Sequence, residues 1–553
     1  MLPMPSTMSE FQLTIGSIFE YGVKVHAESE VITWMGDHAR RATFREVGDR
    51  TRRLARALHR LGISPGDRVG TLCWNTQEHL EAYYAISGMG AVVHTLNIRL
   101  SAEQLTFVIN HGEDRIIIVD VSLYPLLARI AKNLRSVEKI IVVGDAADLP
   151  GKVLRYGELL TAEQPDFIWP ELDERSAAAM CHTTGTTGDP KGVVYSHRSI
   201  YLHALSVCAP WSIGLSNHDR GLCIVPMFHA NAWGIPYAGW MAGMDFLMPG
   251  PFLQPEPLCR FIRECRPTVS AAVPTILAGM FQYALAHAVD LSHFRILFSG
   301  GAALPRSLAE GFLAHYNVKV IQGWGLTETS PVVASAHPPR QCPADQEINW
   351  ATKTGRVIPG VELRICEGDT VLPWDSESVG EFEVRGPWIT ASYYGNRAHE
   401  CFHDGWLRTG DVGVIDERGY LRITDRSKDV IKSGGEWISS VELENAITDH
   451  PDVLEAAVIG VHDDRWDERP LACVVPKNGA PIEIAVLREH LASRVAKWWI
   501  PERWAFIAEV PKTSVGKYDK KALRAAYACG QIKEIIDAFE RAQKEALSAG
   551  PVG

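Results

Sequence analysis

The sequence has no long uninterrupted hydrophobic run and no excess of basic residues. Its 553 residues include 66 acidic and 55 basic side chains, which give a formal net charge of −11. A general nucleic-acid binder would show a basic patch or a high isoelectric point, so the composition argues against a nucleic-acid partner. No segment approaches the ~18–20 consecutive apolar residues that a membrane-spanning helix needs. We therefore expect no integral membrane segment, although peripheral association with a membrane stays open.

The sequence also lacks paired cysteines and a recognisable export signal. Its eleven cysteines are scattered from Cys73 to Cys529 and include no CxxC pair. An odd number of scattered cysteines in a long chain favours reduced, buried thiols over disulfides. The first fourteen residues show no basic stretch followed by an apolar one, which argues against a signal peptide. These features predict a cytoplasmic protein.

Helix and strand patterns alternate over the first part of the chain. Helices are predicted over 43–62, 76–89 and 102–111, and strands over 68–73, 91–95, 115–119 and 140–143. Strands that alternate with helices of this length indicate βαβ units and parallel sheets. Because single hydrophobic cores stop growing at about 250–300 residues, the chain should form more than one domain.

Four later strands are predicted, and three of them end in turns marked by Gly or Pro. They cover 222–226, 268–273, 296–298 and 318–322. Ligands of open α/β sheets bind at the carboxyl ends of strands, so we expect these turns to line one crevice. From Thr354 the pattern changes to short strands and turns, which predict a small β-rich subdomain. A compact α+β pattern follows the polar junction 425–429.

The most informative stretch, residues 182–197, reads HTTGTTGDPKGVVYSH. Glycines let the backbone approach a phosphate closely, and exposed N–H groups in a turn form a nest for negative charge. A Walker P-loop needs Gly-Lys-Ser/Thr, whereas here Lys191 lies between Pro190 and Gly192. A plain surface loop would explain the Thr and Gly content but not this order. We interpret the stretch as a phosphate-binding loop.

Three later motifs carry residue types that suit a nucleotide. In GWGLTET (323–329), Trp324 can stack on a flat ring and Glu328 can hold Mg²⁺ beside phosphate oxygens. Asp411, after a Thr-Gly turn, can accept hydrogen bonds from both hydroxyls of a ribose, and Arg426 can bond the same ribose or neutralise phosphate. Lys517 lies in a Gly-containing loop near the C-terminus. Taken singly, Trp324 and Glu328 could equally be a core and a capping residue, and Asp411 and Lys517 would be interpreted as a turn and a surface residue.

In their order along the chain, these motifs resemble those of the adenylate-forming superfamily of acyl-CoA synthetases, luciferases and peptide-synthetase adenylation domains. The resemblance covers roughly residues 15–527, and the segments VPMFHANAW (225–233) and DRSKDVIKSGGEWISSVELE (425–444) look most like bacterial medium- and long-chain fatty-acid–CoA ligases. It implies an α/β protein. A large N-terminal domain (1–424) would contain αβαβα-layered sheets and the β-rich subdomain, and a hinge (425–430) would connect it to a small mobile α+β domain (431–553).

The resemblance implies a reaction in two steps. The carboxylate of a medium- or long-chain fatty acid attacks the α-phosphate of ATP to give acyl-AMP and pyrophosphate, and the thiol of CoA then displaces AMP. The implied cofactors are ATP, Mg²⁺ and CoA, and the other partner is the small-molecule acid. The resemblance does not decide whether the protein forms a homodimer.

The resemblance also assigns roles to individual residues of this chain. Lys517, Glu328 and Thr184 are implied to be catalytic; Lys517 would bridge the carboxylate and the α-phosphate, and the other two would hold Mg²⁺. ATP or AMP would be bound by Thr183, Thr184, Gly185, Thr186, Thr187, Gly188, Lys191, Gly300, Gly301, Ala302, Gly323, Trp324, Gly325, Leu326, Thr327, Asp411, Ile423 and Arg426. Asp425 would be the hinge, the acyl pocket would contain His229, Ala230, Trp233, Gly234 and Val273, and CoA would contact Lys432, Ser433, Gly434, Gly435, Glu436 and Trp437. Trp324 departs from the family's usual Tyr, which leaves stacking intact and puts only the phenol's hydrogen bond in question.

The sequence leaves the substrate open. Trp233 could gate a fatty-acid tunnel or form the floor of a short pocket for a small aliphatic or thioether acid such as 3-methylthiopropionate, since each added CH₂ contributes only ~0.8 kcal/mol of burial. Transfer to a carrier protein and luciferase-type oxygenation are alternatives for the second step. Residues 232–239 contain no acid, which disfavours amino-acid substrates. A non-catalytic binding protein would be expected to have lost Lys191, Glu328 or Lys517, and all three are present.

Overall fold

The structure is a computed structural model. It describes Met4, Leu149 and residues 6–145, 152–183, 189–395, 398–426, 429–433, 436–463, 465–477, 479–480, 482–512 and 518–536, and of Glu436, Trp437 and Ile536 the backbone only.

Within the described ranges, seven strands of the N-terminal part form one sheet in the order β7–β6–β5–β3–β4–β8–β9. Their bounds are β3 (Arg68–Leu72), β4 (Val92–Thr95), β5 (Asp114–Asp120), β6 (Lys139–Val143), β7 (Leu154–Arg155), β8 (Ala177–His182) and β9 (Gly192–Ser196). Neighbouring strands are parallel except β8 and β9, which form an antiparallel pair. The predicted phosphate loop is the connection between these two strands.

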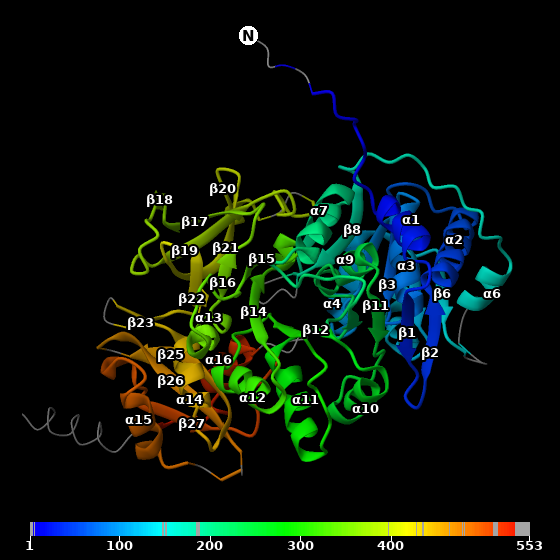
Figure 1. Cartoon of the computed structure of the whole chain (residues 1–553). Coiled ribbons are helices and arrows are strands. Elements are labelled where there is room, and N and C mark those ends of the chain that lie inside the picture. The colour runs from blue at the N-terminus through cyan, green and yellow to red at the C-terminus, as the bar shows by residue number, and fades with distance from the viewer. Residues whose placement is uncertain are drawn as a thin grey trace, which may run out of the picture.

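A second sheet changes from parallel to antiparallel along its width. Its parallel part contains β1 (Glu30–Trp34), β10 (Arg220–Leu222), β11 (Asp245–Met248), β12 (Val269–Ala272), β13 (Ile296–Ser299) and β14 (Val320–Gly325), with β2 (Ala39–Thr43) antiparallel at the edge. Its antiparallel part contains β15 (Val332–Ser335), β16 (Gly355–Val357), β17 (Glu362–Glu367), β18 (Thr370–Val371), β19 (Gly380–Arg385), β20 (Phe402–His403), β21 (Trp406–Ile415) and β22 (Tyr420–Arg426). The antiparallel part is the predicted β-rich subdomain, at the upper left of Figure 1.

Helices cover both faces of the seven-stranded sheet and of the parallel part of the second sheet. Along β5, Ile116 and Ile118 face the core between the sheets, whereas Ile117 and Val119 face an outer core. This alternation buries the strand on both faces, as parallel sheets require. The central layer contains α1 (Ile15–Val25), α2 (Phe44–Arg60), α3 (Gln77–Gly88), α6 (Tyr156–Thr161), α7 (His197–Cys208) and α9 (Ile235–Ala242). The outer layers contain α4 (Ala102–Gly112) and α5 (Tyr124–Ile130) on one side, and α10 (Pro255–Cys265), α11 (Pro274–Ala286) and α12 (Arg306–Tyr316) on the other. The predicted αβαβα layering is confirmed.

The C-terminal residues form their own sheet and cores, at the lower left of Figure 1. The strands are β23 (Ile431–Ser433), β24 (Glu436–Ile438), β25 (Val453–Asp463), β26 (Asp467–Pro476), β27 (Arg503–Phe506) and β28 (Ile535–Ile536). Helices α14 (Ser440–Thr448) and α15 (Ile484–Ala492) pack on one face, and α16 (Lys520–Ala528) packs on the other. In the described residues, none of these strands pairs with a strand of the larger sheets. The remaining helices are α8 (Ala230–Trp233) and α13 (Glu347–Ala351).

Most predicted elements agree with the structure to within a few residues, but the strand predicted over 222–226 is wrong. Strand β10 ends at Leu222, because the side-chain amide of Asn75 donates to the carbonyl oxygens of Cys223 and Val225, both at 2.7 Å. The apolar run is buried, and beyond the bond from Cys223 N–H to Leu247 O of β11 (2.9 Å) its carbonyl groups at 223 and 225 bond to a side chain. Within the described ranges, no helix combines the length and apolarity needed to cross a membrane.

Gly22 of α1 gives a test of the packing between α1 and α9. A Cβ atom at Gly22 would lie 2.2 Å from Nε1 of Trp240, a fully buried side chain that stacks on Phe44. Replacing a helical glycine with alanine ordinarily stabilises a helix by about 1 kcal/mol. Here we expect Gly22→Ala to lower the thermal unfolding midpoint, because overpacking costs about 1–3 kcal/mol.

Gly16 of the same helix is the matched control for Gly22→Ala. The nearest atom to a Cβ at Gly16 is Oγ1 of Thr14, at 3.7 Å. Gly16→Ala should therefore leave the unfolding midpoint unchanged or raise it. An equal rise for both variants in scanning calorimetry would contradict the described packing.

Candidate active site

A large cavity lies where the carboxyl ends of the parallel strands meet the C-terminal α+β unit. Its volume is about 1850 Å³. Its walls come from the ends of β13 and β14, the β21–β22 pair, the loop before β9 and the helices α14 and α16. The predicted crevice is therefore present, and it includes segments more than 300 residues apart in the sequence, such as Lys191 and Lys520.

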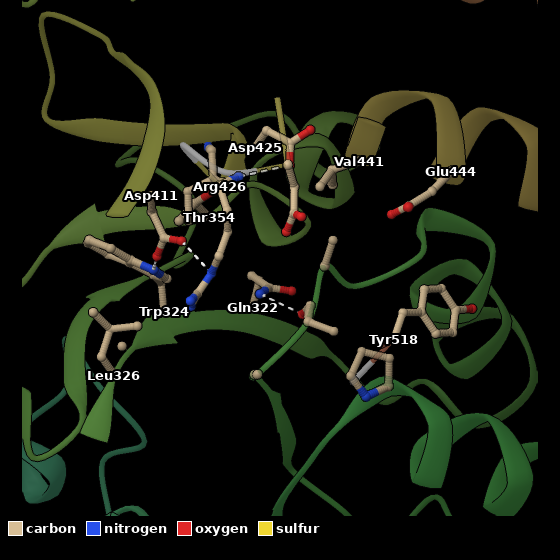
Figure 2. A pocket seen from close by; sticks show the side chains of 18 of the residues that line it. Gln322, Trp324, Leu326, Thr354, Asp411, Asp425, Arg426, Val441, Glu444 and Tyr518 are labelled. Atoms are coloured by element: carbon tan, nitrogen blue, oxygen red, sulfur yellow. Dashed lines mark hydrogen bonds and ion pairs between the residues drawn. The ribbon is translucent and has the colours of Figure 1, made fainter. Parts of the chain in front are cut away.

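A carboxylate with two donors lies at the centre of one wall. Asp411, which is 4% exposed, accepts a hydrogen bond from Nε1 of Trp324 at Oδ2 (2.8 Å) and pairs with Nε of Arg426 at Oδ1 (3.0 Å). Figure 2 shows the Asp411 carboxylate between these two side chains. The Asp411 carboxylate raises the pKa of Arg426, so the guanidinium stays charged. Each carboxylate oxygen keeps a further lone pair and can still accept a ligand hydroxyl.

The strand register explains this arrangement. Asp411 does not follow a turn, as the Thr-Gly dipeptide before it predicts; it lies within β21, directly opposite Arg426 of β22. Trp324 lies within β14, which continues beyond the predicted end at residue 322 to Gly325. The indole N–H of Trp324, for which the sequence analysis predicted no partner, is the donor that connects β14 to β21.

The turn after β13 forms a second wall, and it meets the predicted acyl pocket. Gly300, Gly301 and Ala302 line the cavity together with Gly323, Leu326 and Thr327. A Cβ atom on Gly300 would lie 2.9 Å from the indole of Trp233, so only glycine allows this contact. Ile423 also lines the cavity, as predicted for a nucleotide-binding residue.

The predicted acyl segment has an unusual backbone. The four residues 230–233 and Gly234 all have positive φ, between 43° and 76°. Positive φ at consecutive non-glycine residues costs of order 1–3 kcal/mol each and is typical of functional sites. His229, Ala230 and Trp233 line the cavity, whereas Gly234 and Val273 are not among its lining residues. Gly234 instead packs against His203.

The base of the phosphate loop is described, and its tip is not. Thr183 N–H donates to Lys191 O (2.9 Å) and Lys191 N–H donates to Thr183 Oγ1 (3.1 Å), which closes the loop at its ends. Both residues line the cavity. Thr184, Gly185, Thr186, Thr187 and Gly188 lie outside the described residues.

Glu328 faces the same cavity from the 3₁₀ turn η2 (Thr327–Thr329). Its Oε1 accepts a hydrogen bond from Tyr393 Oη (2.7 Å). The ammonium of Lys191 lies 4.9 Å from the centre of the Tyr393 ring and 3.5 Å from Cys401 Sγ. Sequence reasoning missed both Tyr393 and Cys401, because neither belongs to a pattern that indicates ligand binding.

The junction at Asp425 is held by the first turn of α14. Asp425 Oδ2 accepts hydrogen bonds from the backbone N–H (2.8 Å) and the hydroxyl of Ser440. Burial raises the pKa of Asp425, while Lys520 acts in the opposite direction. Lys520 in turn pairs with Glu444 of α14 at 2.8 Å. The predicted hinge residue is therefore buried in a polar network that connects β22, α14 and α16.

The C-terminal residues with predicted roles divide into two groups. Lys517 lies outside the described residues, but Lys512 and Tyr518 on either side of its loop pair with each other and line the cavity. Lys432 and Ser433 do not line it; Ser433 Oγ accepts a hydrogen bond from Arg469 Nη1 (3.0 Å). Gly434 and Gly435 lie outside the described residues, and Glu436 and Trp437 are described only as backbone of β24.

Comparisons with known proteins agree with this geometry. The model of the family "AMP-binding enzyme" matches residues 19–394, and that of the "AMP-binding enzyme C-terminal domain" matches residues 442–517. The chain is 42% identical over 531 residues to a long-chain-fatty-acid–CoA ligase of Thermus thermophilus, covering 95% of this chain and 97% of the relative. It is 41% identical over 522 residues to a 3-methylmercaptopropionyl-CoA ligase of Ruegeria lacuscaerulensis, covering 93% and 97%. A medium-chain-fatty-acid–CoA ligase of Ectopseudomonas oleovorans is 38% identical over 535 residues, with 95% and 98% covered.

Solved structures show the same architecture. The anthranilate CoA ligase AuaEII in complex with anthranoyl-AMP superposes with a TM-score of 0.86 at 26% identity, covering 96% of this chain and all of that one. The ATP-bound MatB of Rhodopseudomonas palustris gives a TM-score of 0.81 at 25% identity, covering 94% and 99%. The family match extends over well more than half of the chain, and the cavity walls come from both matched regions. The protein therefore belongs to the family of AMP-binding enzymes.

Proposed function

We propose that this protein is an ATP-dependent acyl-CoA synthetase. It converts a carboxylic acid and ATP to acyl-AMP and pyrophosphate, and then acyl-AMP and CoA to acyl-CoA and AMP. The observation that supports this best is the near-full-length similarity to CoA ligases, at 38–42% identity, combined with one cavity lined by the two ends of a phosphate-type loop, a paired carboxylate and a Gly-rich turn. The preferred acid is a medium- or long-chain fatty acid. The similarity to the Ruegeria ligase makes 3-methylmercaptopropionate the second candidate.

The roles of the cavity residues follow from their chemistry. The free lone pairs of Asp411 accept the ribose hydroxyls, and the Trp324 side chain and the turn 300–302 hold the adenine. Lys191 and the threonines of the loop 183–188 bind the β- and γ-phosphates. Lys517 supplies an ammonium between the substrate carboxylate and the α-phosphate, two anions that must meet for the bond to form. The reaction is catalysed by positioning and charge, without a covalent intermediate on the protein.

Glu328 fits a magnesium ion that is shared with ATP. One carboxylate facing a cavity beside a phosphate loop matches the way Mg²⁺ binds, with few protein ligands and several oxygens from substrate phosphates. Among the described residues, no cluster of three His, Cys, Asp or Glu side chains offers an alternative metal site. Glu328, together with Thr184, would hold the ion, which neutralises phosphate charge when bound.

We propose that residues 1–424 and 431–553 are two domains that rotate about a hinge at 425–430. Support comes from the C-terminal strands, which pair only among themselves in the described part of the chain. In the described conformation, the flanks of the Lys517 loop face the cavity and Lys432 does not. This is the arrangement that acyl-AMP formation needs, and a rotation would bring residues 432–437 to the site for CoA. All eleven cysteines are free thiols, which supports a cytoplasmic location.

Pyrophosphate release from ATP, measured with straight-chain acids of increasing length and with 3-methylmercaptopropionate, tests the function. We expect acid-dependent release of pyrophosphate and a thioester product only when CoA is added. Lys517→Ala should reduce acyl-AMP formation by ~10²–10³, the loss expected for one charge-stabilising donor. A wild-type protein that consumes no ATP with any of these acids would contradict the proposal.

Trp324→Phe tests the bond between the indole and Asp411. The variant keeps the aromatic ring but loses the N–H that donates to the carboxylate. Because hydrogen bonds to charged groups contribute about 1.5 kcal/mol or more, the KM for ATP should rise about tenfold, while the KM for the acid stays unchanged. The matched control is Trp169→Phe, which loses an indole hydrogen bond to a carboxylate oxygen, Oε1 of Glu20 (2.8 Å). Neither residue lines the cavity, so this variant should leave the KM for ATP unchanged. An equal KM for ATP in Trp324→Phe and wild type would exclude the role.

Asp425→Pro tests the hinge. Proline fixes φ near −65°, so it prevents rotation while residue 424 stays in the extended conformation that proline prefers before it. Acyl-AMP formation should persist, and thioester formation should fall by at least about tenfold, or ~1.4 kcal/mol in barrier. Asp425→Ala removes the same carboxylate but leaves φ free, so it should retain both half-reactions. Equal loss of the two half-reactions in Asp425→Pro would contradict the hinge.

A further inference from the structure

Residues 388–394, which we call the bridging segment, connect the end of β19 to the turn before β20 and lie against two parts of the site. The backbone N–H of Thr390 donates to Glu328 O (2.8 Å), and the backbone N–H of Tyr394 donates to Gly192 O (2.8 Å). The segment is therefore fixed at one end to the turn that carries Glu328 and at the other to the first residue after Lys191. Tyr393 lies between these two anchors.

The side chain of Tyr393 contacts both Glu328 and Lys191. It is 5% exposed, its hydroxyl donates to Glu328 Oε1 (2.7 Å), and its ring lies under the Lys191 ammonium at 4.9 Å. An ammonium within about 6 Å of an aromatic ring centre is attracted to the ring face. The hydroxyl of Tyr393 thus interacts with the Glu328 carboxylate, and the face of its ring interacts with the Lys191 ammonium.

Lys191 and Glu328 have opposite charges and line one cavity, yet no ion pair joins them, although the structure describes both. If they formed an ion pair, the carboxylate would have less negative charge to attract a metal ion, and the ammonium would have less positive charge to attract a phosphate. Tyr393 gives each of them a neutral partner instead. A phenol has an ordinary pKa of about 10, so the Tyr393 hydroxyl is protonated at neutral pH and can donate to the carboxylate.

We infer that Tyr393 is a positioning residue for magnesium-bound ATP: its hydroxyl orients the Glu328 carboxylate, and its ring keeps Lys191 from pairing with that carboxylate. This inference rests on the proposed function, which assigns ATP and Mg²⁺ to the cavity. Carboxylates that bind metals are themselves held by hydrogen bonds, and loss of such a partner costs about 10–100-fold in metal affinity. The hydrogen bond to Oε1 restricts the carboxylate but leaves lone pairs for an ion.

Tyr393→Phe separates orientation from stacking, because it removes only the hydroxyl. ATP binding is measured by isothermal titration calorimetry, once in EDTA and once at a series of Mg²⁺ concentrations. We expect the Mg²⁺ concentration that gives half of the maximal effect to rise about tenfold or more, with ATP affinity in EDTA unchanged. The matched control is Tyr394→Phe, whose ring contacts His111 (5.2 Å) instead of the two charged groups; its Mg²⁺ requirement should equal that of the wild type.

Tyr393→Leu removes the ring as well, so Lys191 can reach Glu328. We expect a larger Mg²⁺ requirement than in Tyr393→Phe, in the order wild type, Phe, Leu. A wild-type Mg²⁺ response in Tyr393→Phe overturns the orienting role, and equal responses of the Phe and Leu variants overturn the separating role. If wild-type protein binds no ATP under any of these conditions, the proposed function fails, which is distinct from a failure confined to the variants.

Discussion

Strand β14 has a parallel neighbour, β13, on one side and an antiparallel neighbour, β15, on the other. The layered α/β part and the β-rich part are therefore one continuous sheet, and the end of β14 lies where they join. A Cβ on Gly325 would lie 1.8 Å from the carbonyl oxygen of Pro331, so this join needs glycine. Because β14 carries Trp324 and leads directly to Glu328, the sheet itself sets where the candidate adenine and phosphate sites lie. The geometry of the site depends on this single strand.

Three cationic side chains that line the cavity each have a partner within the protein. Arg426 pairs with Asp411, Lys520 with Glu444, and Lys191 lies on the Tyr393 ring. An isolated buried charge would cost several kcal/mol, so such pairing lets the fold keep positive charge inside a large cavity. The Lys191 partner is neutral, which leaves the full charge of that ammonium for a phosphate. The Arg426 partner is charged and remains in place to accept hydroxyls. The neutral partner thus belongs to Lys191, the cation expected to bind a phosphate, and the charged partner belongs to Arg426, which is expected beside the ribose.

Local patterns in the sequence predicted most of the fold. Helix α2 begins and ends within two residues of the predicted range, because Thr43 and Glu46 form a capping box at its start and its buried face repeats at helical spacing. The strand predicted over 222–226 failed for a reason that no local pattern contains, since Asn75, about 150 residues away, takes its carbonyl groups. In the candidate site, too, local patterns identified single residues, and contacts between distant segments decided how they are arranged. Asp411 and Arg426 were identified singly, but their pairing is a property of the β21–β22 register.

By itself, the sequence determined the alternation of helices and strands and the resemblance to adenylate-forming enzymes. Through that resemblance it also determined the layered α/β architecture and the candidate nucleotide-binding residues of the cavity, because periodicity and the order of motifs can be followed along the chain. Only the tertiary structure decided that Trp324 bonds to Asp411, that Asp425 is held by the first turn of α14, and that Tyr393 lies between Lys191 and Glu328. Each of these contacts joins residues that are distant in sequence. Their distances are set by how strands pair and helices pack, and no pattern along the chain carries that information.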